Sequence, residues 1–132
     1  EETNIGEEIE VEGIKIRTEK CNHPPAATPV TFLITTEDGV KIYHTADSLP
    51  FPEMEQIGRE YKPDLVFCTV GIAPGCSPET GVEIAKLIKP KVAIPYHTAS
   101  RHDLEKFCEI ISKELPEVKC LLVEKGKTYK YP

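Results

Sequence analysis

The sequence has no tryptophan, one methionine and no long apolar run, and the lack of a long apolar run limits the class of protein to which the chain can belong. No apolar stretch approaches the ~20 residues of a membrane-spanning helix, and none reads as a secretory signal, so we expect a cytoplasmic protein with no membrane partner. The net charge is −6, and the basic residues are scattered rather than gathered into the basic stripe of a nucleic-acid-binding protein. We therefore predict no nucleic-acid partner.

The five cysteines match no structural zinc motif such as C-x2-C. Cys108 falls on the apolar face of a predicted helix, and Cys68 and Cys120 fall in strand-like runs. We expect these three to be small buried hydrophobic residues in a reducing cytosol. Cys76 lies in a loop rich in glycine and proline, where an exposed, reactive thiol is the alternative to a packed one.

Length and composition predict one globular domain. A chain of 132 residues is long enough to bury an ordinary core, and 39% hydrophobic with 29% charged residues is typical of folded soluble proteins. The chain begins Glu-Glu-Thr without a methionine, so we expect it to be processed or cut from something longer.

The first third of the sequence predicts β-structure. Residues 8–12 and 14–17 alternate apolar and polar side chains around Gly13, a pattern that indicates a hairpin with one buried face. The proline-rich stretch 19–29 predicts irregular structure. Residues 30–35 and 40–44 are rich in β-branched side chains and predict two strands, joined by a turn at Gly39.

From there onward, strands alternate with helices. The pattern predicts a helix from Met54 to Tyr61, a helix that Ser77 caps and that ends before Pro90, and a helix from about residue 101 to 115. It also predicts a strand at residues 65–70 that is buried on both faces. Two further strands are predicted at residues 92–94 and 118–123, and a polar tail with a possible edge strand at residues 126–132.

This alternation predicts a largely parallel α/β unit, whose functional groups gather on loops beyond the carboxyl ends of the strands. Asp47, the loop 71–80 and His97 occupy such places, and His23 lies in the proline-rich loop. Taken alone, His97 is either a packed side chain with its nitrogens hydrogen-bonded or a ligand that points into a shared site. Imidazoles and a carboxylate on separate loops are common ligands of zinc and similar ions.

Three runs carry a resemblance to a known family: GVKIYHTADS, MEQIGREYKPDLVFCTVG and SPETGVEIAKLIKPKVAIPYHTAS. In order and spacing they resemble the C-terminal half of metallo-β-lactamase-superfamily hydrolases, in the metal-dependent branch that includes ascorbate-6-phosphate lactonase-like proteins. The resemblance covers roughly residues 8–125. It implies half of an αββα sandwich, a mixed sheet with helices on one face, as a single partial domain over residues 1–132.

The resemblance also implies a site. His23 takes the place of a histidine that binds the first metal, Asp47 that of the aspartate that bridges two metals, and His97 that of the histidine that binds the second. The implied cofactor is one or two divalent ions, with zinc expected and manganese or iron as alternatives. The implied activity is hydrolysis of a small-molecule ester, lactone or phosphodiester by metal-bound hydroxide. No other residue is assigned a catalytic role. Cys21 is either an additional soft ligand or a packed or exposed thiol, and we expect His44 to be packed and His102 to be solvated.

The sequence departs from the family pattern in three respects. Ala46 stands where the family usually has glycine before the bridging aspartate, PYHTAS replaces a bulkier run, and the metal motif His-x-His-x-Asp-His is absent. We therefore expect this chain to bind metal weakly and to be inactive by itself. We also expect another chain or a second copy to cover the exposed sheet face.

Two other functions remain open at this stage. One is a non-catalytic α/β module for assembly or small-molecule binding, in which the metal site is degenerate. The other is a flavodoxin-like nucleotide-binding domain, although the loops lack a glycine-rich phosphate cradle.

Overall fold

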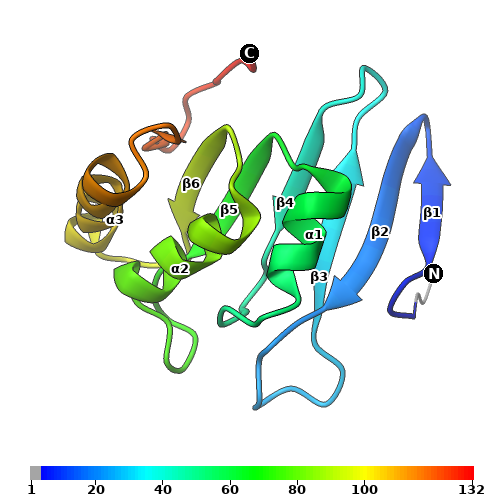
Figure 1. Ribbon diagram of the computed structural model, residues 1–132, viewed down its shortest axis with the longest axis horizontal. Helices are drawn as coiled ribbons and strands as arrows, with labels where there is room; N and C mark the ends of the chain where they lie inside the picture. Colours follow the sequence, from blue (N-terminus) through cyan, green and yellow to red (C-terminus); the bar gives the residue numbers. More distant parts are fainter. Residues whose placement is uncertain (1–3) are drawn as a thin grey trace.

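The computed structural model describes residues 4–132, which form a seven-stranded mixed sheet and three helices (Figure 1). The strands are β1 (Glu8–Val11), β2 (Ile14–Lys20), β3 (Val30–Thr35), β4 (Lys41–His44), β5 (Leu65–Thr69), β6 (Val92–Tyr96) and β7 (Lys119–Cys120). The helices are α1 (Met54–Tyr61), α2 (Pro78–Ile88) and α3 (Arg101–Glu114). The predicted mixed α/β fold is confirmed.

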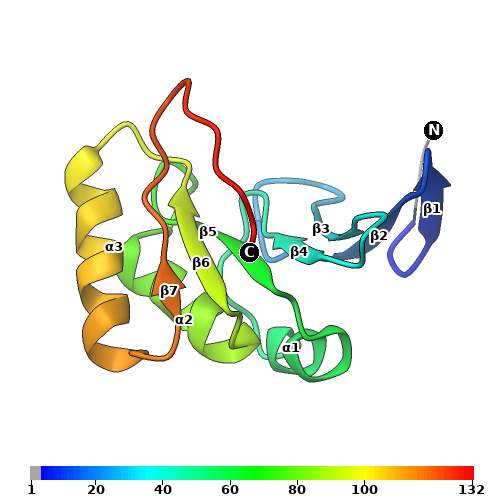
Figure 2. The ribbon, with the colours of Figure 1, turned by 90° about the horizontal axis from the view of Figure 1, so that it is seen from above.

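The strands lie in the sheet in the order of the sequence, β1 to β7. Strands β1 to β4 pair antiparallel through hairpins, and β4 to β7 pair parallel across the helices. Because each right-handed crossover moves one strand further in the same direction, all three helices are placed on one face of the sheet. Figure 2 views the sheet from its edge, with the helices on one side and the C-terminal segment on the other.

The core lies between the helices and the sheet. Its largest fully buried side chains include Tyr43, Met54, Ile84 and Phe107. Helix α2 approaches the sheet closely because Gly81 has no side chain: a Cβ there would lie 2.7 Å from Cγ1 of Val70. The close packing of α2 on Val70 restricts movement at the carboxyl end of β5.

The predicted elements agree with the structure except at a few places. β2 continues through Lys20, and Asn22 then pairs with Leu49, so the proline-rich loop is attached to the sheet at its start. The expected strand 118–123 is reduced to β7, since only Leu121 beyond it donates a backbone hydrogen bond to its neighbour, at 3.0 Å to the carbonyl oxygen of Ala93.

The expected edge strand at 126–132 was also wrong. Within the described part of the chain, residues 121–132 form no strand, and the last four turn back over the open face of the sheet. There the Tyr131 hydroxyl donates to Asp64 Oδ1 at 3.4 Å, and Lys91 Nζ lies 3.1 Å from the same oxygen.

The open face is only partly covered. A hollow of about 680 Å³ lies between the outer side chains of the parallel strands and the C-terminal segment, and Leu65, Phe67, Ile94, Leu121 and Val123 line it. Leu65 and Phe67 are half-buried, so the expectation that β5 is buried on both faces was wrong. The helices cover one side of β5, and the short C-terminal segment does not fully cover the other.

A disulfide joins Cys108 of α3 to Cys120 of β7, with Cα atoms 5.4 Å apart. The expectation that both are unpaired hydrophobic residues was therefore wrong. Helix α3 leads directly into β7 and packs beside it, which places the two Cα atoms within the range that a disulfide spans. Cys68 is a buried free cysteine, as predicted.

We predict that Ser77→Ala lowers the free energy of unfolding by about 1 kcal/mol, because it removes the cap of α2. The Ser77 side chain accepts from the Thr80 amide at 3.2 Å, and the Thr80 hydroxyl accepts from the Ser77 amide at 2.8 Å. Urea denaturation followed by circular dichroism measures the change. Ser112→Ala, at an exposed position inside α3, is the matched control and should change stability by less than about 0.5 kcal/mol. Equal losses in both variants would contradict the role of the cap.

Candidate functional site

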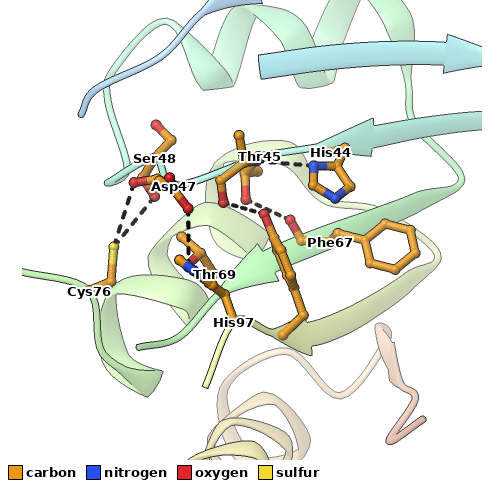
Figure 3. A network of polar contacts seen from close by, with 10 residues as sticks. His44, Thr45, Asp47, Ser48, Phe67, Thr69, Cys76 and His97 are labelled. Carbon is orange, nitrogen blue, oxygen red and sulfur yellow. Dashed lines mark hydrogen bonds and ion pairs between the residues drawn. The ribbon is translucent and has the colours of Figure 1, made fainter. Parts of the chain in front are cut away.

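The carboxyl ends of β4, β5 and β6 meet at one edge of the sheet (Figure 3). The parallel register pairs His44 with Phe67 and Thr69 with Tyr96. The loops that follow these strands are therefore neighbours, although they are far apart in the sequence. Asp47 stands on the first loop, Cys76 on the second and His97 on the third.

Asp47 and His97 are in contact. Oδ1 of Asp47 lies 3.2 Å from Nδ1 of His97, and the Thr69 hydroxyl lies 3.3 Å from the same nitrogen. The Asp47 side chain is 49% exposed and that of His97 is 29% exposed, so a small molecule or an ion can reach both. The contact brings together two of the three predicted ligands.

His23 lies on a segment that is fastened to the Asp47 loop. The Asn22 amide donates to the Ser48 hydroxyl at 3.0 Å, and the Leu49 amide donates to the Asn22 carbonyl at 2.9 Å. His23 is half-buried beside this attachment. Among residues 4–132, however, no three His, Cys, Asp or Glu side chains are arranged to hold a metal ion. The structure thus joins Asp47 with His97 and does not bring His23 into the same cluster.

Two free cysteines, Cys21 and Cys76, lie near Asp47. Cys76 Sγ lies 3.8 Å from the Ser48 carbonyl and 4.0 Å from that of Asp47, and burial raises the pKa of its thiol. Cys21 is buried, and burial likewise raises its pKa. A raised pKa disfavours the nucleophilic thiolate, and Cys76 is half-buried, so the alternative of an exposed, reactive thiol stays a prediction.

The backbone of Ala46, the residue before Asp47, is held by aromatic neighbours. The Tyr96 hydroxyl donates to the Ala46 carbonyl, and the Ala46 amide donates to Nδ1 of His44 at 3.1 Å. His44 is half-buried and hydrogen-bonded, as predicted, and His102 is exposed, also as predicted. Tyr96 and Thr69 were missed from the sequence, where the available signal was only their position at strand ends.

The donor set fits part of a divalent metal site. Carboxylate oxygen and imidazole nitrogen bind zinc at about 2.0–2.2 Å, which places two ligand atoms of a tetrahedral ion roughly 3.4 Å apart. The observed 3.2 Å between Asp47 Oδ1 and His97 Nδ1 is close to that spacing, although a hydrogen bond has the same length. The pair can supply two ligands, fewer than a closed zinc site requires.

Residues 1–97 match the family described as "Beta-lactamase superfamily domain". The match covers more than half of the chain, and the chain therefore belongs to this superfamily, as its resemblance implied. The lactonase-like branch within it stays a prediction.

Among curated proteins, the chain is 30% identical to a UPF0173 metal-dependent hydrolase from Methanopyrus kandleri, over 98% of this chain and 62% of that protein. It is 29% identical to another from Archaeoglobus fulgidus, over 88% of this chain and 52% of that protein. The chain thus spans between half and two thirds of the length of these relatives.

Solved structures share the fold. A metallo hydrolase from the hyperthermophilic archaeon Ignicoccus hospitalis superposes with a TM-score of 0.81, at 22% identity, over 98% of this chain and 60% of that one. The metallo-beta-lactamase fold protein YhfI from Bacillus subtilis gives a TM-score of 0.72, at 16% identity, over 95% of this chain and 53% of that one.

We predict that His44 makes stability depend on pH. Burial lowers the pKa of His44 below its ordinary 6.5, against a smaller opposing effect of Asp47. The folded state therefore binds fewer protons than the unfolded state, so the free energy of unfolding falls as the pH drops from 6.5 through the lowered pKa. Urea denaturation between pH 7.5 and 5 should show a flatter pH dependence for His44→Gln than for the unsubstituted protein. Parallel profiles for the two proteins would contradict the prediction.

Proposed function

We propose that this chain supplies part of the metal site of a metal-dependent hydrolase. The observation that carries the proposal is the contact between Asp47 and His97, at 3.2 Å, on adjoining loops at the carboxyl edge of a parallel sheet. Membership of the superfamily and the likeness to metal-dependent hydrolases support it.

In this proposal, Asp47 and His97 hold a divalent ion, with zinc proposed first because oxygen and nitrogen donors suit it. His23 is proposed as a ligand that completes a neighbouring position once the rest of the site is assembled. When bound, such an ion lowers the pKa of coordinated water and so supplies a nucleophile at neutral pH.

The protein's own groups have defined tasks in this proposal. Asp47 supplies negative charge, and the Thr69 hydroxyl lies 3.3 Å from Nδ1 of His97, beside the nitrogen that would face the ion. The proposed substrate is a small molecule with an ester, lactone or phosphodiester bond. The proposed location is the cytoplasm, although disulfides such as Cys108–Cys120 are uncommon in reducing compartments other than those of hyperthermophiles.

We predict that the chain alone binds Zn²⁺ with micromolar or weaker affinity, because two converging ligands hold the ion loosely. Isothermal titration should show that His97→Ala weakens binding by at least about tenfold, since it removes one of the two donors. His102→Ala, which removes an exposed imidazole at the start of α3, is the matched control and should leave the affinity unchanged. Nanomolar binding that persists in His97→Ala would contradict the proposed site.

A second candidate function is a non-catalytic module for assembly or small-molecule binding. The observation that favours it is that, across the described residues, no three candidate ligands converge. Hydrolysis of a generic ester and a phosphodiester, measured with and without added Zn²⁺, separates the two functions. The same assay should be repeated after adding a polypeptide that carries the part of a relative, such as the Methanopyrus kandleri protein, that lies outside its match to this chain. Activity that depends on that addition supports the hydrolase, and its absence favours the module.

We also infer that another chain, a second copy or a further part of a longer protein covers the open face of the sheet. The hollow there is lined mainly by apolar side chains, and the relatives are longer than the part that residues 1–132 match. A contiguous apolar hollow of this kind is a typical association surface.

We predict that the isolated chain self-associates or binds an apolar dye through this face. Sedimentation velocity and dye fluorescence measure the two effects. Val123→Asp places a charge in the hollow, where Val123 is 40% exposed, and should reduce both. Ile5→Asp, at an exposed apolar residue away from the hollow, is the control. A dilute monomer that binds no dye would contradict the inference.

A further inference from the structure

Ala46, the residue before Asp47, has a left-handed backbone conformation with φ of 49°. An alanine side chain clashes with the backbone in this region, whereas glycine adopts it freely. The direction in which the Asp47 carboxylate leaves the chain depends on this conformation, because the two residues share a peptide bond. Something in the structure must therefore hold Ala46 in an unfavourable state.

Two aromatic side chains hold Ala46 in this conformation, one through its amide and one through its carbonyl. The Ala46 amide donates to Nδ1 of His44 at 3.1 Å, and the Ala46 carbonyl accepts from the Tyr96 hydroxyl. The rings of His44 and Tyr96 pack with centroids 5.0 Å apart, and Phe67 packs edge-on against Tyr96 at 6.0 Å. Both polar groups of Ala46 are thus bound by side chains whose positions are fixed by packing on β4, β5 and β6.

Tyr96 is also the neighbour in sequence of His97, the residue that contacts Asp47. It is bonded to His97, which itself has a positive φ of 65°. The Tyr96 hydroxyl therefore links the backbone that carries His97 to the backbone that carries Asp47. The separation of 3.2 Å between the two functional side chains lies directly beyond this link.

We propose that Tyr96 is a positioning residue for metal binding, whose hydroxyl holds Ala46 in the left-handed conformation that directs Asp47 toward His97. His44 serves the same purpose from the amide side of Ala46. This inference rests on the proposed function of Asp47 and His97 as ligands.

The experiment is a Zn²⁺ titration of the full chain, followed by the imidazole ¹⁵N resonances of His97. Tyr96→Phe keeps the ring and its packing on His44 and Phe67 but removes the hydroxyl. We expect it to weaken Zn²⁺ binding about tenfold, which is the lower end of the effect of losing a residue that orients a ligand. In the Tyr96→Phe background, Ala46→Gly should restore most of the lost affinity, because glycine adopts a positive φ without help.

The matched control is Tyr43→Phe. The Tyr43 hydroxyl also makes a buried hydrogen bond, at 3.0 Å to Oγ1 of Thr31, but it lies in the core beneath the helices. Its loss should lower stability and leave the Zn²⁺ affinity unchanged. Asp47→Asn is the second arm and should weaken binding at least as strongly as Tyr96→Phe.

The possible results separate the two claims. If Asp47→Asn leaves binding intact, the proposed function fails, and this inference fails with it. If Asp47→Asn weakens binding but Tyr96→Phe does not, the metal site stands and the positioning role of Tyr96 is overturned. A loss in Tyr96→Phe that Ala46→Gly does not reduce also overturns it, because Tyr96 would then act other than through the conformation of Ala46.

Discussion

The parallel pairing of β4, β5 and β6 is the constraint on which the rest of the molecule depends. It sets the carboxyl ends of three strands side by side, with His44 opposite Phe67 and Thr69 opposite Tyr96. A shift of one residue in either register would move each side chain to the other face of the sheet. The Asp47–His97 contact, the packing of the rings and the attachment of the proline-rich loop all follow from this arrangement.

The two faces of the sheet differ in how they are covered. The helices bury the inner face of the parallel strands, where side chains such as Val66 and Ala93 are fully buried. The outer face is covered only by the C-terminal segment, which is attached through Tyr131 to Asp64. The aromatic group that orients Asp47 lies partly on this outer face, since Phe67 also lines the hollow. The proposed metal site and the proposed association surface are therefore adjacent, since Phe67 contacts Tyr96 and lines the hollow.

Most of the fold could be predicted because each element has a local cause. Ser77 and Pro78 start α2, Tyr61 ends α1 shortly before Pro63, and Gly39 has the positive φ of a tight turn. The site could be predicted only in part. Asp47 and His97 stand after recognisable strands, whereas Tyr96 looks like any aromatic residue at a strand end. Within the described residues, no helix combines the length and the apolar composition needed to cross a bilayer.

The sequence by itself determined the order of strands and helices, the superfamily and the two residues that meet at the site. These depend on side-chain periodicity, turn chemistry and short motifs, which act over a few residues. Only the tertiary structure decided that Ala46 is held between His44 and Tyr96, that Cys108 bonds to Cys120, and that the C-terminal segment returns over the sheet. Each of these depends on the register and spacing of elements far apart in the chain, and no local pattern encodes that geometry.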